Sequence, residues 1–309
     1  MNIHAQSATA QAQPTCNEDD TLARRLEATG NFKVLRRLVP RRPTPAPAGN
    51  TNKVGIALDV ETTGLDPAKD DIIEVAMVKF RYSEADEITG VSGVFQSYNE
   101  PSVPIPALVT ELTGITHEMV AGHRIDIAAL EAFVADANII IAHNAAFDRM
   151  FAERLSQTFE HKHWACSQTE VDWRKHRFSG AKLSYILTDM GHFHNAHRAI
   201  DDCHALVEIL GHQLPATAQS VFAELMGCAR RTTVRVWAQR SPFDLKDALK
   251  ARGYRWSDGT DGRPRSWFID VVEDERDAEL SYLKKEIYQR DVGIDCQVMT
   301  AHDRFSSRA

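Results

Sequence analysis

The chain has 309 residues, of which 43% are hydrophobic and 26% charged, the balance of an ordinary soluble globular protein. This length predicts one large and one small domain. No apolar run reaches the length of a membrane span, and the N-terminus lacks the features of a signal or transit peptide. We therefore expect a cytoplasmic protein without a membrane partner.

The cysteines and the distribution of charge indicate the cell compartment and the kind of ligand. Five cysteines without a CxxC pair favour free thiols in a reducing compartment over a disulfide framework. Residues 54–229 carry 12 Lys and Arg against 25 Asp and Glu, whereas residues 1–53 carry 8 against 4 and residues 230–309 carry 16 against 14. An acidic middle between more basic flanks suits a metal-binding domain whose flanks contact phosphate, and it suits an ordinary acidic enzyme equally.

The first fifty residues predict little packed structure. Residues 1–19 are polar and low in complexity, which predicts a disordered tail. A short helical segment is expected over 20–39, with one helix ending near Gly30 and a further turn or two over Phe32–Val39. The Pro-rich run 40–52 predicts an extended linker, whose arginines are either solvated or contact phosphate.

Residues 53–215 predict one α/β domain. Three closely spaced apolar runs predict hairpin-linked strands, and strands then alternate with helices, which indicates a mixed sheet covered by helices. The expected strands are 54–58, 72–82, 91–98, 138–142 and 164–171, and the expected helices are 107–112, 127–137, one ending at 155, 183–190 and 199–210.

The C-terminal part predicts a second, smaller domain. After a connecting segment over 216–232, residues 233–309 predict strands and helices in the order βαββαβ, as in the ferredoxin-like arrangement. The expected strands are 233–238, 254–257, 266–271 and 294–299, and the expected helices are 243–252 and 274–288. This domain holds three of the five tryptophans and several arginines, which either form its core and solvated surface or contact nucleic acid.

Two carboxylates end the first predicted strand. Asp59 and Glu61 are separated by one residue and therefore project to the same side of a strand, before a turn at Gly64. Two ionised carboxylates this close repel one another, and a divalent cation would compensate them. The alternative is a pair of solvated acids at a strand end.

Three further residues can complete such a site. Asp148 lies where a predicted strand meets a helix, and His197 precedes the helix that contains Asp202. Four carboxylates and an imidazole suit a two-metal site for phosphoryl displacement, in which the histidine accepts a proton from water. Taken singly, Asp148 is also explained as a charge favoured at a helix N-terminus and His197 as a surface residue. The neighbouring His192, His194, Cys203 and His204 leave a zinc site as an alternative, although no second paired ligand group accompanies them.

Together these segments resemble a known family. Asp-Val-Glu-Thr-Thr-Gly (59–64), His-Asn-Ala-Ala-Phe-Asp (143–148) and His-x-Ala-x-x-Asp (197–202) occur in the order found in the DnaQ-like 3′–5′ exonucleases of the DEDDh subgroup, which include the proofreading subunit of bacterial replicative polymerase. The resemblance covers residues 53–211. It implies a ribonuclease-H-like core.

The resemblance also implies roles for individual residues. Asp59, Glu61, Asp148 and Asp202 would hold two Mg²⁺ or Mn²⁺ ions, and His197 would be the general base. Thr62, Gly64 and Leu65 would lie against the terminal nucleotide. His143 and Asn144 belong to the motif and are expected to support the substrate side of the site rather than to bind metal.

The expected activity is therefore release of nucleoside 5′-monophosphates from single-stranded or frayed 3′ ends, with DNA favoured over RNA. The alternative is an accessory or proofreading subunit that docks a polymerase or another protein through its flanking regions, with the C-terminal domain as the expected contact. We recognise no family resemblance for that domain.

Overall fold

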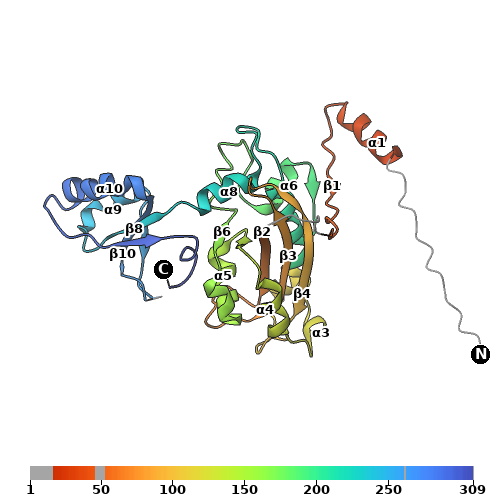
Figure 1. Cartoon of the computed structure of the whole chain (residues 1–309), viewed down its shortest axis with the longest axis horizontal. Helices are drawn as coiled ribbons and strands as arrows, with labels where there is room; N and C mark the ends of the chain where they lie inside the picture. Colours follow the sequence, from red (N-terminus) through yellow and green to blue (C-terminus); the bar gives the residue numbers. More distant parts are fainter. Residues whose placement is uncertain (1–16, 46–52, 261, 309) are drawn as a thin grey trace, which may run out of the picture.

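The computed structural model describes residues 17–45, 53–260 and 262–308, which form a larger domain and a smaller C-terminal domain (Figure 1). The larger domain is built on a five-stranded mixed sheet in the order β4-β3-β2-β5-β6. Its first three strands pair antiparallel, and β2, β5 and β6 pair parallel. The strands are β2 (Lys53–Thr62), β3 (Ile72–Tyr82), β4 (Ile88–Tyr98), β5 (Ile139–Ala142) and β6 (Trp164–Cys166).

Helices cover both faces of this sheet. Ile56 and Leu58 of β2 pack in one core cluster with residues of α4 and α5, and Ala57 packs in another with residues of α6, α7 and α8. Both faces are buried, which explains why the strands have continuous apolar sequences. The helices are α2 (Ala107–Thr113), α3 (His117–Val120), α4 (Ile127–Val134), α5 (Ala145–Leu155), η1 (Gln157–His161), α6 (Leu183–Asp189), α7 (Ala199–Leu210) and α8 (Val221–Ala229). The predicted ribonuclease-H-like mixed sheet is confirmed.

The N-terminal segment differs from its prediction. The expected disordered tail lies outside the described residues up to residue 16, and helix α1 (Asn17–Glu27) begins within its last part. Residues 32–39 are extended rather than helical, because β1 (Arg36–Arg37) pairs in parallel with β7 (His192–Phe193). Of the linker over 40–52, residues 46–52 lie outside the described residues. The described part contacts the domain, where Arg41 pairs with Glu208 at 2.7 Å.

The connecting segment predicted over 216–232 is wrong in its central part. Residues 221–229 form helix α8, and Val221, Phe222 and Leu225 are fully buried in the core of the larger domain. The Ser220 side chain caps this helix by accepting a hydrogen bond from the Ala223 amide. The larger domain therefore extends to residue 229. The strand predicted over 164–171 is also shorter and ends at Cys166, beyond which the chain turns.

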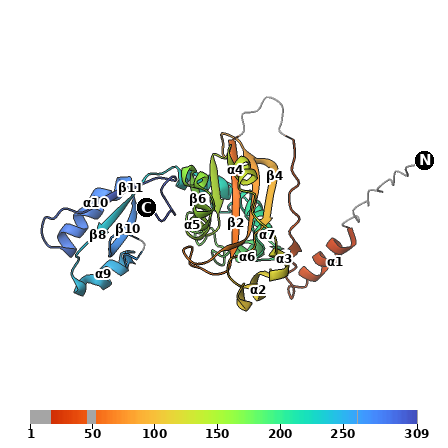
Figure 2. The same ribbon diagram turned by 90° about the horizontal axis from the view of Figure 1, so that it is seen from below.

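The C-terminal domain confirms the βαββαβ order. Its four strands pair antiparallel in the order β11-β8-β10-β9, the arrangement of a split βαβ unit. Helices α9 and α10 lie on one side of this sheet (Figures 1 and 2). Its elements are β8 (Thr233–Ala238), η2 (Phe243–Leu245), α9 (Lys246–Ala251), β9 (Arg255–Ser257), β10 (Ser266–Val272), η3 (Glu273–Glu275), α10 (Arg276–Tyr282), a π-helical turn η4 (Leu283–Ile287) and β11 (Cys296–Met299).

After β11 the chain returns to the larger domain, which was not predicted from the sequence. The Trp164 amide of β6 donates to the Ala301 carbonyl at 2.7 Å. The buried Arg149 of α5 donates to the carbonyls of His302 and Arg304 at 2.7 and 2.6 Å and pairs with Glu153. Residues 300–308 therefore connect the C-terminal domain to α5 and β6.

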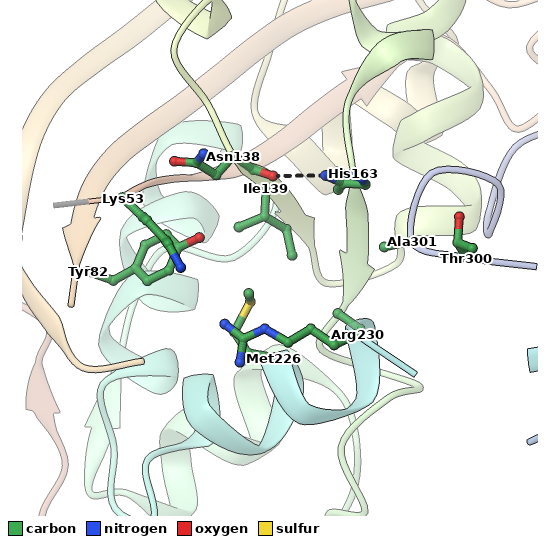
Figure 3. A pocket seen from close by; sticks show the side chains of 10 residues that line it. Lys53, Tyr82, Asn138, Ile139, His163, Met226, Arg230, Thr300 and Ala301 are labelled. Atoms are coloured by element: carbon green, nitrogen blue, oxygen red, sulfur yellow. Dashed lines mark hydrogen bonds between the residues drawn. The ribbon is translucent and has the colours of Figure 1, made fainter. Parts of the chain in front are cut away.

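A cavity of about 340 Å³ lies where this returning segment meets the larger domain (Figure 3). Lys53 and Tyr82 line one part of it and Thr300 and Ala301 another, and His163 contacts the Asn138 carbonyl across 3.3 Å. Lys53 opens β2, six residues before Asp59, so this cavity lies at the far end of the strand from the predicted site, about 20 Å away. Among the described residues, no helix has both the length and the apolar composition needed to cross a bilayer.

Candidate active site

Carboxylates from two elements meet at the end of β2. Asp59 and Glu61 project together from this strand, as the spacing predicts, and Asp202 lies in the first turn of α7. Oxygen atoms of the three side chains lie within 4.8 Å of one another. They form the one group of three or more Asp, Glu, His or Cys side chains with this geometry in the described part of the chain. Sequence segments more than a hundred residues apart thus supply one acidic cluster.

Asp148 faces the same cavity from α5. Helix α5 follows β5 directly, so Asp148 of its first turn stands beside the neighbouring strand β2. The side chain is buried, and its Oδ1 accepts a hydrogen bond from the Val60 amide at 3.2 Å. The cavity has a volume of about 640 Å³, and its walls include all four predicted carboxylates and His197.

Burial and mutual repulsion raise the pKa values of these carboxyl groups. Burial is the main cause for Glu61, followed by the charges of Asp202 and Glu74, and its pKa rises to about 8. Burial likewise raises the pKa of Asp148 to about 7, against the opposing effect of the Val60 hydrogen bond. The pKa of Asp59 is raised by burial and by Asp148. Positively charged side chains therefore do not neutralise the negative charge of this cluster. Its carboxylate oxygens are hard donors that fit a divalent cation such as Mg²⁺ or Mn²⁺.

A fifth carboxylate, Glu74, supports the site from β3. It lies opposite Glu61 in the strand register and is fully buried. Its Oε2 accepts a hydrogen bond from the Ala199 amide at 3.2 Å and lies 3.5 Å from the Arg198 guanidinium, which in turn donates to the Tyr98 hydroxyl. Glu74 thus fixes the start of α7, three residues before Asp202. The sequence contained a signal for it, a lone acidic residue inside the apolar run 72–82.

His197 lies at the edge of the cavity on the loop before α7. It is exposed and has a left-handed backbone conformation with a φ of 64°. Its amide donates to Asp202 Oδ2 at 2.9 Å, while His194 Nε2 contacts Asp202 Oδ1 at 2.6 Å. The backbone of His197 is therefore tied to a predicted metal ligand, and its imidazole remains accessible from the cavity.

The turn after β2 forms one wall of the cavity, with Thr62, Gly64 and Leu65 among its lining residues. Thr62 Oγ1 donates to the Gly64 carbonyl at 2.5 Å. A Cβ atom at Gly64 would lie 2.5 Å from the Asp70 carboxylate, which also accepts a hydrogen bond from the Asp66 amide. The close approach of Asp70 explains the need for glycine here.

Helix α2 contributes an apolar part of the cavity wall, which was not predicted as part of the site. Leu65 is 82% exposed, and Leu108 and Leu112 of α2 are 73% and 54% exposed. All three line the cavity together with Phe147 of α5. A signal for this wall was present in the sequence, because Leu108 and Leu112 are one helical turn apart and therefore lie on the same face of a short helix.

Asn144 and His143, the first two residues of the motif 143–148, differ in their position relative to the cavity. Asn144 is exposed and lines the cavity. His143 lies behind it, where Nε2 donates to the Ala181 carbonyl at 2.7 Å and Nδ1 accepts from the Ser167 hydroxyl at 2.8 Å. Burial lowers the pKa of His143 to about 4, so the ring is neutral. A contact between His143 and substrate remains a prediction.

The histidines and the cysteine considered as zinc ligands do not form a group of three or more potential ligands within the described ranges. His194 instead contacts Asp202, and Cys203 is buried against the Ala76 carbonyl. Burial, with the nearby carboxylates, raises the pKa of the Cys203 thiol, which opposes formation of the thiolate that zinc prefers.

Comparison with known proteins places this domain in a family. Residues 56–210, half of the chain, match the RNase_T exonuclease model. The chain is 31% identical over 165 residues to a PolC-type DNA polymerase III of Clostridium perfringens (strain 13 / Type A), which covers 50% of this chain and 11% of the polymerase. It is 39% identical over 99 residues to the PolC-type polymerase of Latilactobacillus sakei, covering 31% of this chain and 6% of the polymerase.

Solved structures similar to this chain are also exonucleases. A structure of exonuclease X with 5′-overhanging duplex DNA matches 55% of this chain and 99% of its own, with 21% identity and a TM-score of 0.39. The zinc-bound complex of Escherichia coli exonuclease I with single-stranded DNA matches 72% and 63%, with 16% identity and a TM-score of 0.49. The chain spans only 11% and 6% of the length of these two polymerases. From the match over residues 56–210, the chain belongs to the RNase_T exonuclease family and contains a DnaQ-like exonuclease domain.

Proposed function

We propose that the protein is a 3′–5′ exonuclease of the DEDDh type that removes nucleoside 5′-monophosphates from single-stranded or frayed 3′ ends of DNA. The observation that carries this proposal is the meeting of Asp59, Glu61 and Asp202 in one cavity with Asp148 in its wall. DNA is favoured over RNA because the relatives that match this domain are DNA polymerases.

The four carboxylates would hold two Mg²⁺ or Mn²⁺ ions. Bound there, the ions would stabilise the negative charge that develops on the attacking and leaving oxygens of a phosphodiester. The carboxyl groups must be ionised to do this, and their raised pKa values in the absence of cations imply that cation binding releases protons.

His197 would act as the general base. Its exposed imidazole lies at the cavity edge, and its backbone is held by Asp202, so the ring can reach a water molecule beside the acidic cluster. In the proposed step the water gives a proton to a ring nitrogen while its oxygen bonds to phosphorus. The bond from phosphorus to the 3′-oxygen breaks, and that oxygen takes a proton from solvent. The products are a nucleoside 5′-monophosphate and a strand one nucleotide shorter.

The cavity walls would position the terminal nucleotide. Thr62, Gly64 and Asn144 place polar groups near the carboxylates, while Leu65 and Leu112 offer apolar surface at the mouth. Apolar side chains can pack against the faces of unpaired bases. A paired end would have to separate before its last nucleotide entered.

End-labelled strands test this proposal. With Mn²⁺, a 3′-labelled single strand should release labelled mononucleotide at once, and a 5′-labelled strand should give a ladder of shortened products. EDTA should stop both reactions, and Asp59→Ala should abolish them. Release of mononucleotide from the 5′ label first, or near wild-type cleavage by Asp59→Ala, would contradict the proposal. The same strands made of RNA measure the sugar preference.

A further inference from the structure

The C-terminal sheet has one face that its helices do not cover. Val234 and Val236 of β8 pack in the cluster formed with α9 and η4, so the alternate residues Arg235 and Trp237 project to the opposite side. Both views show α9 and α10 on one side of the sheet (Figures 1 and 2). Phe268 of β10 lies directly opposite Trp237 in the strand register and therefore shares this face. Both rings are buried, at 6% and 4% exposed, so the arginines packed on them form the accessible surface.

Arginines are stacked on the aromatic rings of the open face. The Trp237 and Phe268 rings lie 5.1 Å apart. The guanidinium groups of Arg235 and Arg255 lie 4.9 and 4.7 Å from the centre of the Phe268 ring, and that of Arg263 lies 5.8 Å from it. We call these five residues the arginine–aromatic face. Stacking of this kind holds a guanidinium flat and leaves its edge for hydrogen bonds.

Arg235 of this face keeps a hydrogen-bond donor that the described residues do not use. Asp270 pairs with both Arg235 and Arg255 at 2.7 Å, so two cations share one carboxylate. Arg235 is only 7% exposed, yet its Nη1 has no hydrogen-bond partner among the described residues. The buried Ser257 hydroxyl, on the same face of β9 as Arg255, also lacks one there. Buried donors are normally paired, so these point to an acceptor supplied by a ligand.

A cavity of about 340 Å³ extends the face beyond the end of β8. Its walls include Trp237, Arg240, Tyr288 and Arg290, so it combines two more arginines with an aromatic wall and one acidic residue, Asp295. A ligand that matches the whole surface must offer negative charge, oxygen acceptors and flat rings. A nucleic-acid strand with unpaired bases has all three, because its phosphates can pair with arginine and its bases can stack on exposed guanidinium groups such as that of Arg255.

We propose that the arginine–aromatic face binds single-stranded DNA upstream of the 3′ end that is cleaved. This inference rests on the proposed exonuclease activity and gives the C-terminal domain the role of holding the strand. Two observations support it: Arg235 and Arg255 share the single carboxylate of Asp270, and the Nη1 of Arg235 has no hydrogen-bond partner among the described residues. Residues 300–308, which connect this domain to the larger one, accept hydrogen bonds from Arg149 of α5, the helix that carries Asp148.

The test compares two double variants of the full chain on strands of different length. Arg255→Gln with Arg263→Gln removes two charges from the face, and Arg276→Gln with Lys285→Gln removes two charges from exposed positions on the helical side as a matched control. The Arg255 side chain is 63% exposed, so the sheet does not depend on it. Strands of about 20 and about 4 nucleotides separate binding by the face from binding by the active site alone.

For the face variant we expect the KM of the long strand to rise about tenfold, with kcat and the KM of the short strand unchanged. Affinity measured in EDTA by fluorescence anisotropy should fall by a similar factor. The slope of log affinity against log salt should become shallower by about 1.4, since each lost phosphate contact on a single strand contributes about 0.7. The control variant should match the wild type.

The outcomes separate this inference from the proposed function. If the wild type cleaves and the face variant binds and cleaves long strands as the control does, the inference is wrong and the exonuclease proposal stands. The inference is equally wrong if the face serves an acidic protein instead, because the KM of the long strand would then be unchanged. If the wild type cleaves neither strand, the proposed function fails and this inference falls with it.

Discussion

Replacement of Glu61 by glutamine should stabilise the cation-free protein at high pH while removing part of its cation site. Burial and the neighbouring carboxylates raise the pKa of Glu61 from 4.5 to about 8. Between these values the folded chain binds more protons than the unfolded chain, so this group lowers the free energy of unfolding as pH rises through the window. Glutamine keeps the size of the side chain and removes the charge.

The size of the effect follows from the pKa. Each tenfold change in proton affinity is worth about 1.4 kcal/mol, so ionisation of Glu61 at pH 8 costs the folded state at most about 5 kcal/mol. Protonation of the adjacent Asp59, whose pKa is also raised, relieves part of the repulsion, and water reaches the half-buried group. We therefore expect Glu61→Gln to gain about 2 kcal/mol at pH 8 and a small fraction of that at pH 5.

Urea unfolding in EDTA at pH 5 and pH 8 measures this difference, with Glu111→Gln as a control at an exposed position. Added Mn²⁺ should reverse the order at pH 8, because the wild type then gains more from the bound cation than the variant does. A Glu61→Gln protein no more stable than the wild type at pH 8, or equally stabilised at both pH values, would refute the electrostatic account of the cluster.

Three further predictions concern single positions. His197→Ala should lower kcat by about 10²–10⁴-fold with little change in strand affinity measured in EDTA, and a variant that binds poorly yet cleaves normally at saturation would show that His197 is not the base. Arg149→Met should lower the free energy of unfolding by about 3 kcal/mol in urea titrations, because it leaves Glu153 and two carbonyls without their buried partner; a loss below about 0.5 kcal/mol would mean that residues 300–308 are not fastened there. Gly64→Ala should reduce cleavage at least about tenfold, since its Cβ would displace the Asp70 carboxylate that holds the turn, and wild-type rates would show that this turn does not position substrate.

Many strands and helices of the larger domain could be predicted because the spacing of apolar residues within each short segment indicates its secondary structure. The run 72–82 predicted β3 to the residue, and the spacing of Asp59 and Glu61 placed both carboxylates on one side of β2. The order of three motifs indicated the family before any contact between them was known. Residues 233–238 and the βαββαβ order likewise predicted the C-terminal sheet.

The elements that were missed depend on contacts between distant parts of the chain. Residues 36–37 have no strong strand pattern and become β1 only by pairing with β7. Residues 300–308 carry no motif, and their place is set by Arg149, whose partners lie more than 150 residues away. Glu74 was hidden inside an apolar run, since its role depends on the strand register and on Arg198. Helix α8 was different, because its apolar residues have a helical spacing that could have predicted it.

We propose that Asp202 belongs to a cation site that drives cleavage, whereas its neighbour Asp201 does not. Asp202 meets Asp59 and Glu61, while Asp201 contacts Asn195 outside that cluster. Calorimetric titration of Mn²⁺ into Asp202→Asn and Asp201→Asn, with the cleavage rate measured on the same samples, tests this directly. We predict that Asp202→Asn loses both cation binding and cleavage and that Asp201→Asn keeps both. Cleavage by Asp202→Asn at the wild-type rate, or equal losses in the two variants, would show that Asp202 is not the distinguishing cation ligand.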